Sequence, residues 1–285
     1  PGTSKTYGAE KTIERFLIEE LPEDLKDDDE KAELIKLKKD RVGFVQFHPS
    51  FDYEDFIEGI TTNFVEKQIE FVTKKGIFKT FIDKVKNPSN SEKLYFFIID
   101  EINRADLSRV LGELMYCLEN RGDDHKIITR VSGEDFFIPE NLVIIGTMNT
   151  TDKSIDSFDL ALRRRFKWFE RTFDENKLEE ILTENLPENK KVDEAEIEKI
   201  QNEITKADNL NKELTKVLGE DFIVGHTIFS NIEEGETSFK KNHLKPLLKE
   251  YFRGVVDSNK ELESTVNKII DEHYKLKTYP KNDKK

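Results

Sequence analysis

The 285-residue sequence has a single cysteine, Cys117, which excludes an intramolecular disulfide and a metal site built from several cysteines. It has no apolar run long enough to span a membrane and no signal peptide. It also lacks excess positive charge, since 46 Lys and Arg residues stand against 59 Asp and Glu residues. Duplex binding needs clustered cations, so this chain is not expected to wrap nucleic acid unaided. These absences predict a soluble cytoplasmic protein. Cys117 lies in a helical pattern and is expected to be a small core residue and not a nucleophile.

The length suits about two domains, and the residue pattern changes once, near residue 173. Before that point, β-rich apolar runs alternate with helical patterns, which predicts an α/β domain over residues 1–172. After it, charged helical patterns take over and predict a helical domain over residues 173–285. The helical domain contains one long amphipathic seam, formed by Ile197, Ile200, Ile204, Leu210, Leu214 and Val217.

The most informative stretch runs from Leu94 to Ile99 without a polar residue and then meets two acids, Asp100 and Glu101. Such a run is typical of a strand buried on both faces, central in a parallel sheet. Its carboxyl end would lie at the sheet edge where α/β proteins bind ligands. There, Asp100 could hold Mg²⁺ through water and Glu101 could activate an attacking water. The plainer alternative is a buried strand followed by a solvated acidic turn.

The chain opens with half of a phosphate-binding loop. In the pattern G-x-x-x-x-G-K-[ST], Lys5 and Thr6 fit the last two positions, while Ser4 stands at the preceding glycine. If the motif is real, backbone N–H groups of Gly2, Thr3, Ser4 and Lys5 wrap the phosphates. Lys5 then reaches the terminal phosphates and the Thr6 hydroxyl binds Mg²⁺. The given sequence would thus begin inside its own phosphate loop; a tag remnant or a disordered start is the alternative.

Several other elements are predicted from local pattern. Strands are expected at Val42 to Phe47 and at Leu142 to Thr147, the second leading into Met148-Asn-Thr-Thr-Asp152. The acidic run Glu23 to Glu30 indicates a solvated connection. One helix is expected to carry the apolar repeat from Leu107 to Leu118 and to end at Arg121-Gly122. A hairpin is expected around Ser132 to Asp135. Another helix should end in three arginines, 163–165, and be followed by a short strand.

The parts follow one another as phosphate loop, acidic strand end, polar strand end, arginines and helices, and each has a role in phosphoryl transfer. The three arginines could also be a solvated helix end that matches the helix dipole, an alternative that the presence of the other parts disfavours. His226, beside Gly225, could face a nucleotide or simply pack. The predicted roles are charge neutralisation by Lys5, Mg²⁺ binding by Thr6 and Asp100, water activation by Glu101, water orientation by Asn149, and stabilisation of the transferred phosphoryl group by Arg164 or Arg165.

The order resembles an AAA+ nucleotide hydrolase, and the wording of the motifs resembles the McrB family. Ile98-Ile-Asp-Glu-Ile-Asn-Arg104 is similar to that family's Walker B motif, and Pro139 to Asp152 is similar to its sensor-1 segment. Ala161 to Phe166 resembles its arginine-finger region. Three further segments resemble blocks after its second strand and in its helical lid: Val45 to Gly59, Val224 to Phe229 and Pro246 to Phe252.

The resemblance implies an AAA+ P-loop fold with a C-terminal helical lid, and a GTP-driven motor of a McrBC modification-dependent restriction system. It implies a ring, usually hexameric, whose GTPase is stimulated by the McrC nuclease subunit. Asn149 and Asp152 match positions tied to GTP hydrolysis. Two departures are Ser4 in the phosphate loop and Lys153, where an arginine is common. DNA would be read by a separate domain that is absent from this sequence, as is any nuclease motif.

Two other classes stay open. One is a MoxR-like ATPase that remodels protein complexes. The other is a scaffold that keeps the fold without hydrolysis, against which the presence of Glu101 and Asn149 argues. The choice of GTP over ATP rests on the resemblance alone.

Overall fold

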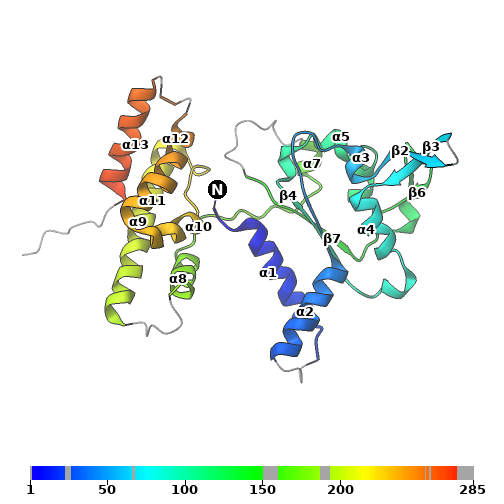
Figure 1. Cartoon of the computed structure of the whole chain (residues 1–285), viewed down its shortest axis with the longest axis horizontal. Helices are drawn as coiled ribbons and strands as arrows, with labels where there is room; N and C mark the ends of the chain where they lie inside the picture. The colour runs from blue at the N-terminus through cyan, green and yellow to red at the C-terminus, as the bar shows by residue number, and fades with distance from the viewer. Residues whose placement is uncertain are drawn as a thin grey trace, which may run out of the picture. The chain divides into compact units, whose positions relative to one another are not determined.

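The computed structural model of the chain describes residues 2–22, 27–65, 68–149, 160–186, 193–253, 255–256 and 258–274. The chain divides into two compact units (Figure 1). The sheet unit comprises Lys5–Phe169, and the helical unit comprises Glu170–Lys285 together with Pro1–Ser4. Residues 2–4 therefore pack with the helical unit, although the sequence predicts them as part of the α/β domain.

The sheet unit is built on three parallel strands in the order β1-β4-β7, namely β1 (Val42–Gln46), β4 (Tyr95–Asp100) and β7 (Leu142–Gly146). Gln46 pairs with Asp100, and Ile99 pairs with Gly146. All three carboxyl ends thus meet at one sheet edge. The predicted fold class, a parallel α/β sheet flanked by helices, is confirmed, and both predicted outer strands are correct to within one residue.

The central strand β4 is covered on both faces, as its unbroken apolar run predicts. Phe96 and Ile98 point to one face, where they pack against α1 (Lys5–Ile18) and α2 (Asp27–Arg41). Tyr95, Phe97 and Ile99 point to the other face. That face is covered by α3 (Tyr53–Phe56), α4 (Ile77–Val85), α5 (Leu107–Leu111) and α6 (Leu114–Glu119). Burial on both faces gives Asp100 and Glu101 a rigid support.

Three local predictions are wrong. The helix expected from Leu107 to Leu118 is two helices, because Gly112 takes a φ of 49° and ends α5. The predicted acidic connection overlaps a helix, since α2 begins at Asp27; acidic residues are favourable in the first turn of a helix. No strand follows α7 (Leu160–Arg163) within the described residues 164–174. Cys117 is a buried core residue, as predicted.

Two small antiparallel hairpins accompany the sheet. The hairpin β2 (Glu58–Val65) and β3 (Gln68–Lys75) separates α3 from α4 and extends away from the parallel sheet (Figure 1). The other pairs β5 (Ile127–Ile128) with β6 (Asp135–Phe136) around the predicted turn. The first hairpin is absent from the sequence-based expectations.

A buried ion pair ties both hairpins to α4. Lys79 Nζ lies 2.5 Å from Glu58 Oε2 and donates to Glu134 Oε2 at 2.8 Å. Glu58 also accepts from the backbone N–H groups of Val131 and Ser132. Burial alone would raise the pKa of Glu58, but the hydrogen bonds from Lys79 and Ser132 outweigh it and hold this pKa at about 2.

Replacing Lys79 with methionine should lower the free energy of unfolding by about 3–5 kcal/mol, because Glu58 would keep a buried charge without its partner. Urea denaturation measures the loss. The variant Lys79→Met/Glu58→Gln, which removes both charges, should regain part of it. In the wild type, the depressed pKa of Glu58 stabilises the fold at neutral pH, and this contribution should be lost as the pH falls from about 5 towards 2. A loss below about 1 kcal/mol in Lys79→Met would contradict the assignment.

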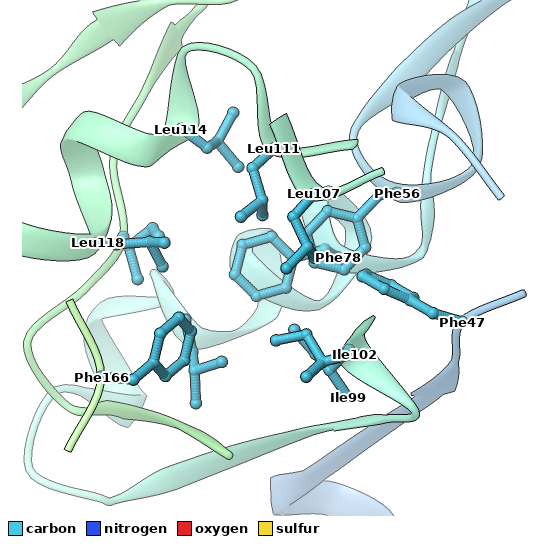
Figure 2. Close-up of a pocket in the computed structure, with 12 residues that line it drawn as sticks. Phe47, Phe56, Phe78, Ile99, Ile102, Leu107, Leu111, Leu114, Leu118 and Phe166 are labelled. Carbon is cyan, nitrogen blue, oxygen red and sulfur yellow. The ribbon is translucent and has the colours of Figure 1, made fainter. Parts of the chain in front are cut away.

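The centre of the sheet-unit core holds a void of about 10 Å³, room for about one water molecule. Figure 2 shows the surrounding side chains, which are all apolar. Ile99 and Ile102 line it immediately before and after the acid pair. It is a packing defect behind the polar sheet edge and is too small and apolar for a nucleotide.

The helical unit consists of α8 (Glu175–Glu184), α9 (Glu194–Leu218), α10 (His226–Phe229), α11 (Glu236–Phe239), a π-helix (Lys240–Leu244), α12 (Lys245–Phe252) and α13 (Asn259–His273). On the predicted seam of α9, Ile200, Ile204, Leu210 and Leu214 are buried, while the end residues Ile197 and Val217 are half-exposed. The described part of this unit contains no strand, as predicted. None of the described helices combines the length and apolarity needed to cross a membrane.

Candidate active site

Three polar side chains, two hydroxyls and one amide, donate hydrogen bonds to Asp100 at the end of β4. Thr6 Oγ1, on α1, donates to Asp100 Oδ1 at 2.5 Å, and Thr147 Oγ1, just after β7, donates to the same oxygen at 2.5 Å. Gln46 Nε2, at the end of β1, donates to Asp100 Oδ2 at 3.1 Å. The sheet register and the start of α1 thus place two hydroxyls and a carboxylate together.

This donor set fits Mg²⁺, which prefers hard oxygen ligands and is usually bound through one or two protein groups plus substrate phosphates. Thr6 and Asp100 would hold the ion, as the sequence predicts. Among the described residues, no cluster of three or more His, Cys, Asp or Glu side chains could hold a metal by itself. In a site of this kind, water and phosphate oxygens would complete the coordination of the metal.

A second chain of contacts links the predicted water activator to the phosphate loop. Asn149 Nδ2 donates to Glu101 Oε1 at 2.7 Å, and Asn149 Oδ1 accepts from Lys5 Nζ at 3.0 Å. Arg104 Nε lies 3.6 Å from the other carboxylate oxygen of Glu101. The structure therefore brings Lys5, Glu101 and Asn149 together, next to Thr6 and Asp100.

Glu101 differs from an ordinary surface glutamate in its backbone conformation and in its environment. Its φ of 51° and ψ of 45° lie in the left-handed region, which is strained for a residue with a side chain. Burial, and then repulsion from Asp100, raise the pKa of the Glu101 carboxyl against the opposing effects of Arg104, Lys5 and Asn149. A carboxylate with a raised pKa is a better proton acceptor near neutral pH than an ordinary glutamate.

In the helical unit, Gly2 at the start of the chain is hydrogen-bonded to Thr227 in α10. Gly2 O accepts from the backbone N of Thr227 at 3.0 Å and from Thr227 Oγ1 at 2.7 Å. Ser4 has a φ of 51°, the left-handed region that favours glycine. The residue that departs from the phosphate-loop pattern therefore takes a backbone conformation that a glycine would adopt without strain.

Two buried polar atoms belong to the residues next to this contact, one on each of the two segments. The side chain of His226 is 4% exposed and its Nδ1 has no hydrogen-bond partner among the described residues; the same holds for the hydroxyl of Thr3, which is 3% exposed. Burial lowers the pKa of His226, against attraction from Asp174. His226 is thus a packed, neutral side chain with one unused nitrogen, so both sequence interpretations remain compatible with its position.

Gly225→Ala should displace Gly2, because overpacking of this kind costs roughly 1–3 kcal/mol. Since Gly2 belongs to the predicted phosphate loop, nucleotide binding should weaken by about tenfold or more. A Cβ on Gly225 would lie 2.0 Å from the carbonyl carbon and oxygen of Gly2, and backbone atoms cannot move aside as a flexible side chain can. Titration with a fluorescent nucleotide measures the affinity. Thr227→Ser, which keeps the hydroxyl that donates to Gly2, is the matched control and should bind normally. Wild-type affinity in Gly225→Ala would refute the close approach.

The two candidate arginines both lie near Glu119, but they differ in exposure and in their other contacts. Arg165 Nε donates to the carbonyl of Met115 at 3.0 Å, and its side chain is 11% exposed. The side chain of Arg164 is 67% exposed and lies 3.4 Å from Glu119. Asp152, the remaining predicted catalytic residue, lies outside the described residues.

Sequence reasoning missed Thr147, Gln46 and Thr227. For the first two a signal existed: each ends or follows a strand of the parallel sheet, and all such ends share the edge with Asp100. Thr227 lies in the lid-like segment Val224 to Phe229, but its contact with Gly2 was not predictable, because the two residues are distant in the sequence.

The parallel sheet, with Asp100 and Glu101 at its edge beside Lys5 and Thr6, defines an AAA-type nucleoside triphosphatase. In agreement, the AAA domain (dynein-related subfamily) matches residues 30–166. Over 95% of its length the chain is 35% identical to the "Type IV methyl-directed restriction enzyme EcoKMcrB subunit" of Escherichia coli (strain K12), covering 55% of that protein. It is also 25% identical to the "Type II restriction enzyme BsuMI component YdiS" of Bacillus subtilis (strain 168), over 44% of this chain and 46% of that one.

The chain belongs to the McrB family of AAA proteins, as its motifs predict. It spans about half the length of each of these two relatives.

Proposed function

We propose that this chain is the GTP-hydrolysing motor of a McrBC-type restriction system, which drives a McrC-like nuclease on modified DNA. The single observation that carries the hydrolytic part is the contact chain Lys5–Asn149–Glu101, which joins a phosphate-binding cation to a positioned base. The restriction role is supported by the kinship with two restriction-system proteins. The same kinship does not favour the MoxR-like alternative.

In the proposed reaction, Lys5 binds the terminal phosphates, and Mg²⁺ held by Thr6 and Asp100 would neutralise phosphate charge. Glu101 accepts a proton from the attacking water, for which its raised pKa suits it. Asn149 orients that water and keeps the Glu101 carboxylate in place through its amide. Asp152, matched by resemblance, is proposed to assist at the same step.

The proposed organisation is a nucleotide-binding domain over residues 1–172 and a lid over residues 173–285. The phosphate loop, residues 2–6, and His226 are proposed nucleotide contacts, on the sequence pattern and on the buried, unused atoms of Thr3 and His226. The active form is proposed to be a ring, with six subunits expected by resemblance, whose turnover rises when the nuclease binds.

The deciding experiment measures hydrolysis of GTP and ATP by the complete protein, alone and with its nuclease partner. We expect GTP turnover that the nuclease increases and little ATP turnover. A clear preference for ATP in competition binding and in turnover would reverse the assignment of GTP. Absence of any turnover, with the protein folded and assembled, would instead favour a scaffold that has kept the fold.

A further inference from the structure

Asn103 contacts a residue of the candidate site but has no role in the proposed reaction. It lies in the short 3₁₀ turn Ile102–Arg104, directly after Glu101, and its Nδ2 donates to the backbone carbonyl of Asn149 at 3.0 Å. The two residues are 46 positions apart in the sequence. The side chain thus crosses from the end of β4 to the chain that leaves β7.

The hydrogen bond from Asn103 to Asn149 lies beyond the last ladder pair of β4 and β7. The last ladder pair between the two strands is Ile99 with Gly146. One residue further, Thr147 N donates to Ile99 O and Thr147 O accepts from Ile102 N, both at 2.9 Å. Asn149 lies beyond that point, yet both ends of its side-chain amide are engaged in the site. A side chain can be aimed accurately only if its own backbone is fixed, and the Asn103 bond reaches that backbone.

The geometry also couples the two reacting groups. Arg104 N donates to Glu101 O at 2.8 Å and closes the turn that carries both Glu101 and Asn103. One rigid turn therefore sets the backbone of Glu101 directly and that of Asn149 through the Asn103 side chain. Any shift of the turn moves both together.

Stability alone does not account for an asparagine here. Its Oδ1 atom is buried and has no donor among the residues that the structure describes, which costs free energy. Turning the amide over would place Oδ1 against the Asn149 carbonyl, so the observed orientation is the favourable one. One half of the amide is left unsatisfied while the other half holds Asn149.

We propose that Asn103 is a positioning residue that fixes Asn149 relative to Glu101, so that hydrolysis depends on it more than nucleotide affinity does. The inference rests on the proposed roles of Glu101 and Asn149. Misplacement of a reacting group by about 1 Å can cost about 10²-fold in rate. We therefore expect Asn103→Ala to lower kcat by roughly ten- to a hundredfold, with nucleotide Kd within about twofold of the wild type.

The test uses the complete protein and steady-state kinetics, nucleotide titration and thermal unfolding. Asn141→Ala is the matched control: Asn141, at the opposite end of β7, also donates through Nδ2 to distant carbonyls, those of Asn90 and Lys93. It should lower the unfolding temperature and leave kcat unchanged. Asn103→Asp should be at least as slow as Asn103→Ala, since it places an acceptor against a carbonyl, and Asn103→Ser serves if alanine impairs folding.

A double-mutant cycle separates positioning from general stability. If Asn103 acts through Asn149, then Asn103→Ala/Asn149→Ala should be no slower than Asn149→Ala alone. Multiplicative losses, or equal falls in kcat, affinity and unfolding temperature, would overturn the inference. Wild-type kcat in Asn103→Ala and Asn103→Ser, with Asn149→Ala inactive, would also overturn it. If the wild type hydrolyses nucleotide but Asn149→Ala and Glu101→Gln are fully active, the proposed site itself fails, and this inference fails with it.

Discussion

Arg164→Ala is expected to reduce nucleotide turnover by about 10³–10⁵-fold while leaving nucleotide binding nearly intact. A guanidinium supplied by a neighbouring subunit neutralises charge that grows on the phosphoryl oxygens only during transfer, so it accelerates the reaction more than it tightens binding. Steady-state hydrolysis beside nucleotide titration measures both quantities. Full activity in Arg164→Ala would rule out a catalytic role for this residue.

The structure favours Arg164 over Arg165 for this role. The side chain of Arg164 is 67% exposed, and exposed ion pairs such as its contact with Glu119 are weak. Arg165 is largely buried and donates to the Met115 carbonyl in its own unit. We therefore expect Arg165→Ala to lower the unfolding temperature, which makes it a control for a loss of fold rather than of chemistry.

Mixing of subunits tests whether the arginine acts between them. Arg164→Ala subunits and Glu101→Gln subunits should each be inactive alone. In a mixed ring, some interfaces pair an intact Glu101 site with an intact Arg164 donor, so part of the activity should return. No recovery in assemblies shown to contain both subunits would count against action in trans, and undiminished turnover by a dilute monomer would argue the same way.

Glu101→Gln should cut turnover by roughly 10²–10⁴-fold, the usual contribution of a positioned general base. Glutamine keeps an oxygen that can accept from Asn149 Nδ2, so the local structure and nucleotide binding should persist. Hydrolysis and nucleotide affinity measured on the same preparation separate the two effects. Near-normal turnover in this variant would remove Glu101 from the mechanism.

The pH dependence of kcat provides a separate check on Glu101. The base must be deprotonated, so activity should fall as the pH drops through its pKa. Because burial raises that pKa, the acidic limb should lie above the ordinary glutamate range. The residual activity of Glu101→Gln should lack this limb. A limb at or below the ordinary range would indicate that Glu101 is solvated in the working enzyme.

The structure also explains why two elements were not predicted correctly. Gly112 divides one predicted helix because its positive φ ends α5, and periodicity alone cannot register a single break that keeps the apolar spacing. The β2–β3 hairpin was detectable, since Ile60, Thr62 and Phe64 alternate along one strand. Its large apolar side chains are exposed in the structure, however, so an expectation that strands bury their apolar residues does not identify this hairpin.

The sequence by itself determined the central strand, the acid pair Asp100 and Glu101, and the change from sheet to helices. These follow from local rules, because an unbroken apolar run must be buried and parallel strand ends share an edge. Only the tertiary structure decided that Thr147 joins Asp100, that Asn103 holds Asn149, and that Arg164 rather than Arg165 is exposed. Each depends on a partner distant in the sequence or on packing by neighbouring elements, and neither is encoded in the spacing of nearby residues.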